Sequence, residues 1–255
     1  MLLVADIGNT TITIGIYNEN RLIQKWSLAS DIKRSDDEYG VIICSFLKHS
    51  ELEGKVTDAI ISSVVLPLTE KIQNAVEKYI GVKTIVVNHK IKTGIAIKTD
   101  KPEEVGADRI VNAYAASLKY SLPVIVVDFG TATSFDIVNN KKEFVGGIIA
   151  AGMKIQAHAL SQFTSKLPKV IIEAPEKTIA TNTFDAMLSG IVRGHSAMID
   201  GLIEGCEKEM GQKVTTVATG GYSSIISKYL KRPFDDVNEN LTLDGLYELW
   251  KINKF

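Results

Sequence analysis

The feature that most constrains this chain is a short pattern that occurs twice at one constant spacing. Each copy is an apolar strand that ends in Asp, passes a Gly and continues as a Thr-rich strand: LLVADIGNTTITIGIY at 2–17 and VIVVDFGTATSFDIV at 124–138. Three residues recur 122 positions later: Asp6 as Asp128, Gly8 as Gly130 and Thr11 as Thr133. Because each copy opens one half of the chain, the repeat predicts two α/β domains of similar design with a cleft between them.

The repeated pattern has a chemical use. A carboxylate at the end of a central strand reaches the crevice where α/β sheets bind ligands, and the Gly lets the backbone approach an anion closely. Thr hydroxyls and turn N–H groups donate to phosphate oxygens. An Asp repels phosphate unless a cation lies between them. One Asp-x-Gly is most often only a hairpin turn, but two copies in register favour a nucleotide-phosphate site.

Composition restricts the class of protein. The 255 residues are 45% hydrophobic and 23% charged, with a net charge of −1, which argues against nucleic-acid and membrane-surface partners. We expect a cytoplasmic protein, because no apolar stretch is long enough to span a bilayer and no signal-peptide pattern begins the sequence. Cys44 and Cys206 form neither a metal-ligand spacing nor a disulfide framework.

Apolar periodicity predicts strands and helices in both halves. The first half is expected to form two strands within 1–17, strands at 21–28, 57–65 and 83–88, and helices at 35–48 and 68–80. The second half is expected to form strands at 121–130, 134–140, 142–152 and 213–221, and helices at 154–163, 182–210, 221–230 and 241–253. The P-loop pattern and the G-x-G spacing of the Rossmann fingerprint do not occur, so the paired hairpins are the predicted phosphate site.

With these residues identified, the chain resembles a known family. The paired hairpins are similar to the phosphate loops of the acetate and sugar kinase, heat-shock cognate and actin superfamily, and the resemblance narrows to type III pantothenate kinase. The motifs follow the family's order: DIGNT at 6–10, GADR at 106–109, DFGTATSFD at 128–136, GGIIAAGM at 146–153, KLP at 166–168, NTFDAMLSGIVRG at 182–194, TGG at 219–221 and LTLDGL at 241–246.

The resemblance implies an α/β fold of duplicated actin-like, ribonuclease H-like domains, with mixed sheets flanked by helices and an interdomain cleft. The expected N-terminal domain covers residues 1–117 and the C-terminal domain covers 118–240. The C-terminal helix, at about 241–255, is expected to pack back on the N-terminal domain.

The implied activity is the ATP-dependent phosphorylation of pantothenate to 4′-phosphopantothenate, the first step of coenzyme A biosynthesis. In this family the Asp of G-x-D-R is the catalytic base, which here is Asp108. Gly106, Ala107, Asp108 and Arg109 would hold the substrate, and Thr183 would touch pantothenate across a homodimer interface. From the residues alone, ADR is more typical of a helix cap with a surface ion pair, and the resemblance reverses that preference. Thr183 alone is typical of a helix N-cap region, and both of its roles can hold.

The resemblance also implies the cofactors. Mg²⁺ would lie near Asp6, and Asp128 would coordinate a monovalent cation, K⁺ or NH₄⁺. Thr131 would contact ATP. The first hairpin would bind the ATP phosphates through Asp6, Ile7, Gly8, Asn9, Thr10, Thr11, Ile12 and Thr13.

One departure and two alternatives accompany this interpretation. Thr99 stands where the family often has a substrate-contacting Tyr, which puts that single contact in doubt. The alternatives are another small-molecule kinase on the same fold and a non-catalytic regulatory protein. A regulator would tolerate the loss of Asp6, Asp108 and Asp128, so the presence of all three favours an enzyme.

Overall fold

The computed structural model describes residues 1–254, and the chain within it forms two compact units. Unit 1 comprises residues 1–118 and the C-terminal segment that begins at Leu241, and unit 2 comprises residues 119–240. The helix predicted at about 241–255 is α8, Leu241–Asn253, and the last predicted residue, Phe255, lies outside the described residues. That the units fold as separate actin-like domains stays a prediction.

Unit 1 is built on a mixed sheet with the strand order β3-β2-β1-β4-β5. Its strands are β1 Leu2–Ile7, β2 Thr11–Asn18, β3 Arg21–Ala29, β4 Asp58–Ser63 and β5 Thr84–Val86. β1 runs antiparallel to β2 and parallel to β4, so it is central and its partners differ in direction. A continuous apolar run suits such a strand, because both of its faces are covered.

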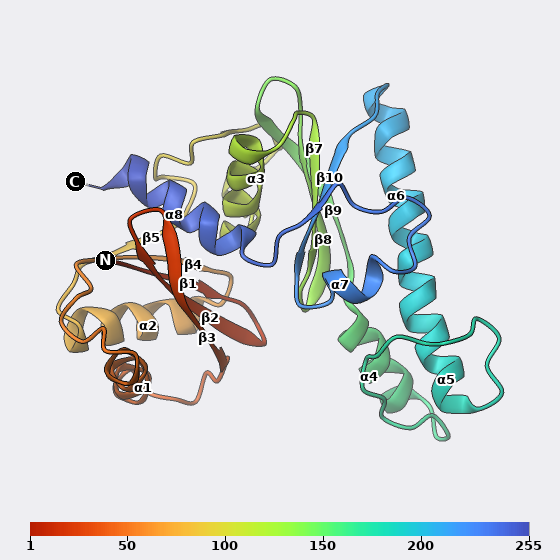
Figure 1. Cartoon of the computed structure of the whole chain (residues 1–255), viewed down its shortest axis with the longest axis horizontal. Helices are drawn as coiled ribbons and strands as arrows, with labels where there is room; N and C mark the ends of the chain where they lie inside the picture. Colours follow the sequence, from red (N-terminus) through yellow and green to blue (C-terminus); the bar gives the residue numbers. More distant parts are fainter. Residues whose placement is uncertain (255) are drawn as a thin grey trace. The chain divides into compact units, whose positions relative to one another are not determined.

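One face of this sheet carries the helices α1, Asp36–His49, and α2, Leu66–Tyr79 (Figure 1). Alternate residues of β1, Leu3, Ala5 and Ile7, join the buried cluster that includes Tyr39 of α1 and Leu68 of α2. Ser35 and Glu38 form a capping box that begins α1. The odd-numbered residues of β1 therefore face the α1–α2 core.

The opposite face of the sheet receives α8, which contacts β1 and β4. Tyr17 donates a hydrogen bond of 2.5 Å to Asp244, and its ring stacks on Tyr247 with centroids 4.8 Å apart. Tyr247 in turn donates to Asn20 at 2.6 Å. A polar and aromatic clamp therefore fixes the last helix of the chain to its first hairpin.

Helix α3, Ala107–Lys119, packs against α8 in the same unit. It was not predicted as an element of its own, although ADR was recognised as a possible helix start. Between β5 and α3 the described chain forms the short β6, Ala96–Ile97, and a 3₁₀ turn, Pro102–Glu104.

Unit 2 repeats the strand arrangement of unit 1. Its strands are β7 Val124–Phe129, β8 Ala132–Val138, β9 Glu143–Ala151, β10 Thr215–Gly220 and β11 Asp236–Val237. Within the unit they lie in the order β11-β10-β7-β8-β9, with β7 antiparallel to β8 and parallel to β10. The predicted α/β fold with two mixed sheets is therefore confirmed.

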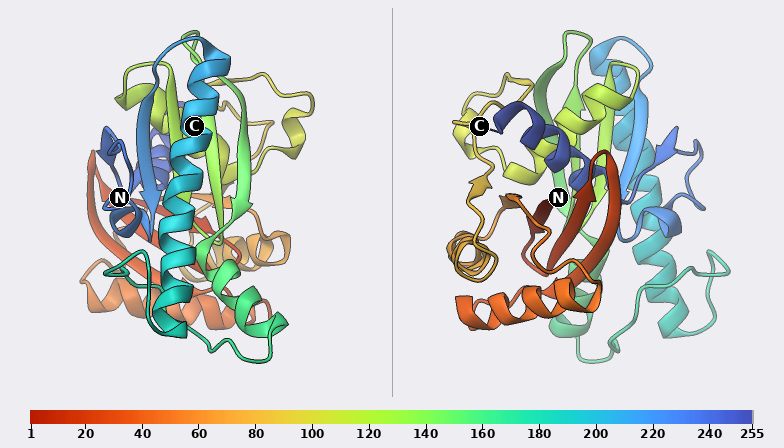
Figure 2. Two further views of the ribbon diagram at one scale, coloured as in Figure 1. Left: turned by 90° about the vertical axis from the view of Figure 1, so that its right-hand side faces the viewer. Right: turned by 60° about the vertical axis from the view of Figure 1, so that its left-hand side comes forward.

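The helices of unit 2 gather on one face of this sheet. They are α4 Met153–Phe163, α5 Thr183–Leu188, a π-helical turn Ser189–Arg193, α6 Gly194–Met210 and α7 Ser223–Ile226. α6 runs along the sheet face (Figure 2, left), where Ile199 joins Val127 and Phe135 in a buried cluster. None of the helices within residues 1–254 is long and apolar enough to cross a bilayer.

Of two predicted helices of unit 2, one has the predicted extent but an irregular turn inside it, and the other was predicted too long. The segment expected as one helix over 182–210 contains the π-helical turn at Ser189–Arg193, and a single extra residue in a turn leaves the apolar pattern almost unchanged. The helix expected over 221–230 ends at Ile226, because Lys228 and Tyr229 bond to carbonyls three residues back. A third helix, expected from Leu68, begins earlier at Leu66, because Pro67 fits the first helical turn.

The contact of α8 with α3 can be tested at Gly245. A Cβ built there lies 2.6 Å from the Val111 carbonyl oxygen and 3.0 Å from the Ala115 Cβ. We expect Gly245→Ala to lower the free energy of unfolding by about 1–3 kcal/mol in urea titrations, because the backbone must move. The control Gly201→Ala, at an open position of α6, should raise it by about 0.5–1 kcal/mol. Equal changes would contradict close packing at Gly245.

Candidate functional site

Asp6 is held near the end of β1 by the sheet register. It pairs with Thr13 on the antiparallel β2 and with Ser62 on the parallel β4. Its side chain lies on the face opposite Ala5 and Ile7, away from the α1–α2 core. Asp6 is half-buried and Ser62 is fully buried, so the carboxylate lies between two hydroxyl residues in register.

The turn after Asp6 is fixed by backbone and serine contacts. Gly8 N–H donates to the Thr11 carbonyl at 3.0 Å, and the Ser30 hydroxyl donates to the Gly8 carbonyl at 2.6 Å. Asn9, Thr10 and Thr11 are exposed. Ile7 and Ile12, both predicted to bind ATP, have fully buried side chains, which leaves only their backbone for such a role. The hairpin thus presents polar residues from a rigid base.

The G-x-D-R motif begins α3. Gly106 accepts the first helical hydrogen bond from Ile110 at 3.2 Å, and the Asp108 carboxylate accepts one from Arg109 N–H at 2.8 Å. A Cβ on Gly106 would lie 2.6 Å from Asp108 Oδ1, so a larger residue there would displace the Asp108 carboxylate. Burial raises the pKa of Asp108, while the Arg109 hydrogen bond and charge partly oppose that rise. The result is a carboxylate of increased basicity at a helix start.

The first hairpin and the G-x-D-R motif both lie beside Val64. Val64 N–H donates to the Ile7 carbonyl at 3.1 Å, and a Val64 methyl lies 3.5 Å from the Cβ position of Gly106. Unit 1 therefore places two segments at one corner, at the carboxyl end of β1 and β4. They are residues 6–13 of the first hairpin and residues 106–109 of the G-x-D-R motif.

In unit 2, Asp128 occupies the place that Asp6 has in unit 1. It pairs with Ser134 on β8 and with Thr219 on the parallel β10. Gly220 follows with φ of +85°, and a Cβ there would lie 2.7 Å from Asp128 Oδ1 and from Phe129 N and O. The space beside the Asp128 carboxylate therefore depends on a residue without a side chain.

Thr131 lies in the turn between β7 and β8 and is half-buried. Gly152 packs against this turn, because its Cβ position is only 2.2 Å from the Thr131 carbonyl oxygen and 2.8 Å from that of Gly130. The glycine that follows β9 thus supports the second hairpin.

A buried histidine links this hairpin to the helical face. His195 of α6 lies 2.9 Å from the Thr133 hydroxyl through Nε2 and 2.9 Å from the Gln156 amide nitrogen through Nδ1. The Gln156 amide also donates to the Ala151 carbonyl at 2.9 Å. Since that amide donates to Nδ1, the neutral imidazole carries its proton on Nε2 and donates to Thr133. No pattern in the sequence predicts this link.

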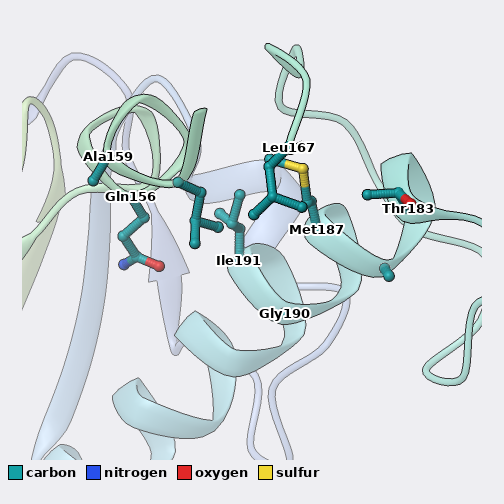
Figure 3. Close-up of a pocket in the computed structure, with 9 residues that line it drawn as sticks. Gln156, Ala159, Leu167, Thr183, Met187, Gly190 and Ile191 are labelled. Atoms are coloured by element: carbon teal, nitrogen blue, oxygen red, sulfur yellow. The ribbon is translucent and has the colours of Figure 1, made fainter. Parts of the chain in front are cut away.

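Thr183, the first residue of α5, borders a pocket of about 610 Å³ in unit 2 (Figure 3). Its hydroxyl-bearing side chain is exposed, and the remaining lining is mostly apolar: Gln156, Ala159, Leu160, Leu167, Ala186, Met187, Gly190 and Ile191. Asp128 points to the other face of the sheet, because its neighbours Val127 and Phe129 face the helices. Within unit 2, Thr183 and Asp128 are therefore not brought together.

Cation binding would depend on single carboxylates. Among residues 1–254, no three His, Cys, Asp or Glu side chains form a metal-binding group. A cation that keeps water and binds phosphate oxygens needs only one or two carboxylates. Asp6 and Asp128, each at the carboxyl end of a central strand, satisfy that requirement.

The close approach of Gly220 to the Asp128 carboxylate can be tested by substitution. We expect Gly220→Ala to lower the free energy of unfolding by about 2–4 kcal/mol, because a Cβ adds left-handed strain and a backbone clash. Gly221→Ala is the control, since its Cβ position is open, and should change the value by less than about 0.5 kcal/mol. Urea titration of both variants measures the difference, and similar values would show that the turn relaxes freely.

The burial of His195 predicts how the free energy of unfolding depends on pH. Burial lowers the pKa of His195, so the unfolded chain takes up the proton first as pH falls. Stability from the neutral ring is complete above the ordinary pKa of about 6.5 and is lost below it. We expect the free energy of unfolding to fall between about pH 7 and 5 more steeply in the native protein than in His195→Gln. Parallel pH profiles would contradict a buried neutral ring.

Comparison with known proteins agrees with this geometry. The sequence model of the type III pantothenate kinase family matches residues 2–205. A type III pantothenate kinase of Finegoldia magna is 43% identical over 258 residues, covering 100% of this chain and 98% of its own. One from Geobacter sulfurreducens is 44% identical and covers 100% of both chains.

A solved structure agrees at the level of the fold. The ROK family glucokinase of Streptomyces griseus, in complex with glucose and AMPPNP, aligns with a TM-score of 0.55 at 13% identity, covering 97% of this chain and 98% of its own. At this identity the likeness supports the fold alone. The family match extends over most of the chain and the relatives over all of it, and the chain belongs to the type III pantothenate kinase family.

Proposed function

We propose that this protein transfers the γ-phosphoryl group of ATP to the primary hydroxyl of pantothenate, the first step of coenzyme A biosynthesis. The observation that carries the proposal is similarity to type III pantothenate kinases over the full chain, together with an intact G-x-D-R motif at the start of α3. Kinase chemistry requires positioned phosphates, neutralised charge and a group that accepts the hydroxyl proton.

Asp108 is the proposed base. Its side chain is fixed by the Arg109 N–H bond, and burial raises its pKa, which increases its affinity for a proton. The adjacent Gly106 leaves the carboxylate uncovered by a side chain on that side. Asp108 would therefore accept the substrate proton as the new bond to phosphorus forms.

The same motif is the proposed substrate site. Arg109 offers a planar guanidinium that suits the pantothenate carboxylate or the transferring phosphoryl group. Gly106 and Ala107 would contribute backbone contacts, which agrees with the buried side chain of Ala107.

The first hairpin is the proposed site for the ATP phosphates. The exposed Asn9, Thr10 and Thr11 supply side-chain and backbone donors, whereas Ile7 and Ile12 would act only through their backbone. Asp6 would hold Mg²⁺ directly or through water, and a bound Mg²⁺ neutralises phosphate charge. One half-buried carboxylate beside two hydroxyl residues suits an ion that keeps much of its water.

Asp128 is the proposed ligand of K⁺ or NH₄⁺, and Thr131 a proposed ATP contact. The space left by Gly220 opens beside one carboxylate oxygen and near the Phe129 carbonyl, and hard cations of this size bind such oxygens. The comparisons support ATP use through the kinase family, and the two cation sites rest on this geometry.

Thr183 is the proposed pantothenate contact supplied by a second subunit of a homodimer. Its pocket is lined mostly by apolar side chains, among them the exposed Leu160, and the neighbouring residue in the sequence, Phe184, is also exposed. Such patches are typical of protein contact surfaces. The proposed site of action is the cytoplasm, and the proposed domains are residues 1–117 with the helix from Leu241, and residues 118–240.

The proposal is tested by ATP turnover with and without pantothenate, in potassium and in sodium buffers. ADP formation should require pantothenate and should be faster with potassium. Turnover with a sugar or acetate instead would favour another kinase of this fold. Nucleotide binding without turnover of any acceptor would favour the regulatory alternative.

Asp108→Asn separates chemistry from folding. We expect kcat to fall by about 10²–10⁴-fold, because the amide cannot accept the proton. Because the folded pKa is raised, the Asp108 contribution to stability is complete below its ordinary pKa and lost as pH rises through the folded value. The variant should therefore match or exceed the native free energy of unfolding at pH 7. An unchanged kcat would show that Asp108 is not the base.

A further inference from the structure

A buried hydroxyl without a hydrogen-bond partner lies in register with Asp6. Ser62 of β4 is fully buried, and its Oγ makes no hydrogen bond within residues 1–254. Its backbone pairs with Asp6 across the parallel ladder, so the two side chains leave the sheet on the same face. Ser62 was not identified from the sequence.

A buried hydroxyl without a hydrogen bond is unfavourable in the core of a folded protein. A buried hydroxyl that loses water and gains no partner destabilises the fold, and an alanine of almost the same shape removes that cost. Along β4 the preceding residue on the same face as Ser62 is Ile60, which is fully buried. Asp6 is the charged residue beside it, so a ligand that changes the Asp6 environment can supply the missing partner.

We propose that Ser62 is a positioning residue for Asp6. When Mg²⁺ and nucleotide occupy the first hairpin, the Ser62 hydroxyl donates to the Asp6 carboxylate and fixes its orientation toward the cation. The terminal torsion of an Asp side chain is broad, so a lateral donor restricts it effectively. The inference rests on the proposed role of Asp6 at the phosphate site.

The second sheet contains the same arrangement. Thr219 on β10 stands beside Asp128 as Ser62 on β4 stands beside Asp6, each on the parallel neighbour of the acidic strand. Both halves thus place a hydroxyl residue at this position. Since a threonine occupies it in unit 2, Ser62→Thr is the conservative variant that keeps the hydroxyl.

The test uses the full chain and Mg²⁺ with AMPPNP, a non-hydrolysable ATP analogue, as the probe. Without ligand, Ser62→Ala should leave the melting temperature unchanged or raise it by up to about 4 °C, because an unpaired hydroxyl is removed. In titration calorimetry the same variant should bind Mg²⁺–AMPPNP about tenfold more weakly, which corresponds to a hydrogen bond to a charged group. Ser62→Thr should restore most of the affinity.

Thr84→Val is the matched control. Thr84 lies in β5 of the same sheet, is buried, and also has a hydroxyl with no hydrogen bond in the described chain. It aligns with Ala59, at the amino end of β4 and away from Asp6. Its replacement should affect the melting temperature in the same way as Ser62→Ala and leave nucleotide affinity unchanged.

The outcomes separate the inference from the proposed function. A marked fall in the ligand-free melting temperature of Ser62→Ala, or native affinity in that variant, would overturn the role of Ser62. Native protein that binds Mg²⁺–AMPPNP but does not phosphorylate pantothenate would overturn the substrate assignment and leave the Ser62 result standing. Native protein that does not bind the nucleotide would overturn both.

Discussion

The register between each acidic strand and its parallel neighbour is the constraint on which the rest of the structure depends. In unit 1 it aligns β1 with β4, and in unit 2 it aligns β7 with β10. Side chains alternate along a strand, so a slip of one residue would turn Asp6 into the α1–α2 core and Ile7 out of it. The same apolar packing that stabilises each sheet therefore fixes the face on which its acidic residue, Asp6 or Asp128, lies.

Each unit also contains polar groups in environments that do not favour them. Asp108 of unit 1 is a carboxylate whose burial opposes its charge, His195 of unit 2 is a ring whose burial favours the neutral form, and Ser62 of unit 1 is a hydroxyl without a hydrogen bond among residues 1–254. Each is tolerated because it belongs to an element anchored by many apolar contacts: α3, α6 and β4. The local destabilisation that these three groups cause is therefore offset by the surrounding apolar cores.

Much of the fold was readable from local pattern. The central strands, both hairpins and the acidic residues at 6 and 128 follow from short stretches whose periodicity is unambiguous. Ser62 was not readable, because its importance comes from alignment with a strand more than fifty positions earlier in the chain. The π-helical turn was not predicted for another reason. Its one added residue rotates the apolar face of α5 relative to that of α6, while the apolar pattern within each helix stays intact. The Thr133–His195–Gln156 link joins three separate elements and has no sequence signal.

The return of α8 to unit 1 has a consequence for biosynthesis. During translation, residues 119–240 leave the ribosome before the segment from Leu241, whose helix α8 covers one face of the first sheet. Until Asp244 and Tyr247 have been synthesised, the face of β1 and β2 that carries Tyr17 therefore stays uncovered in the nascent N-terminal unit. The later-made unit can finish first, which reverses the usual order of cotranslational folding.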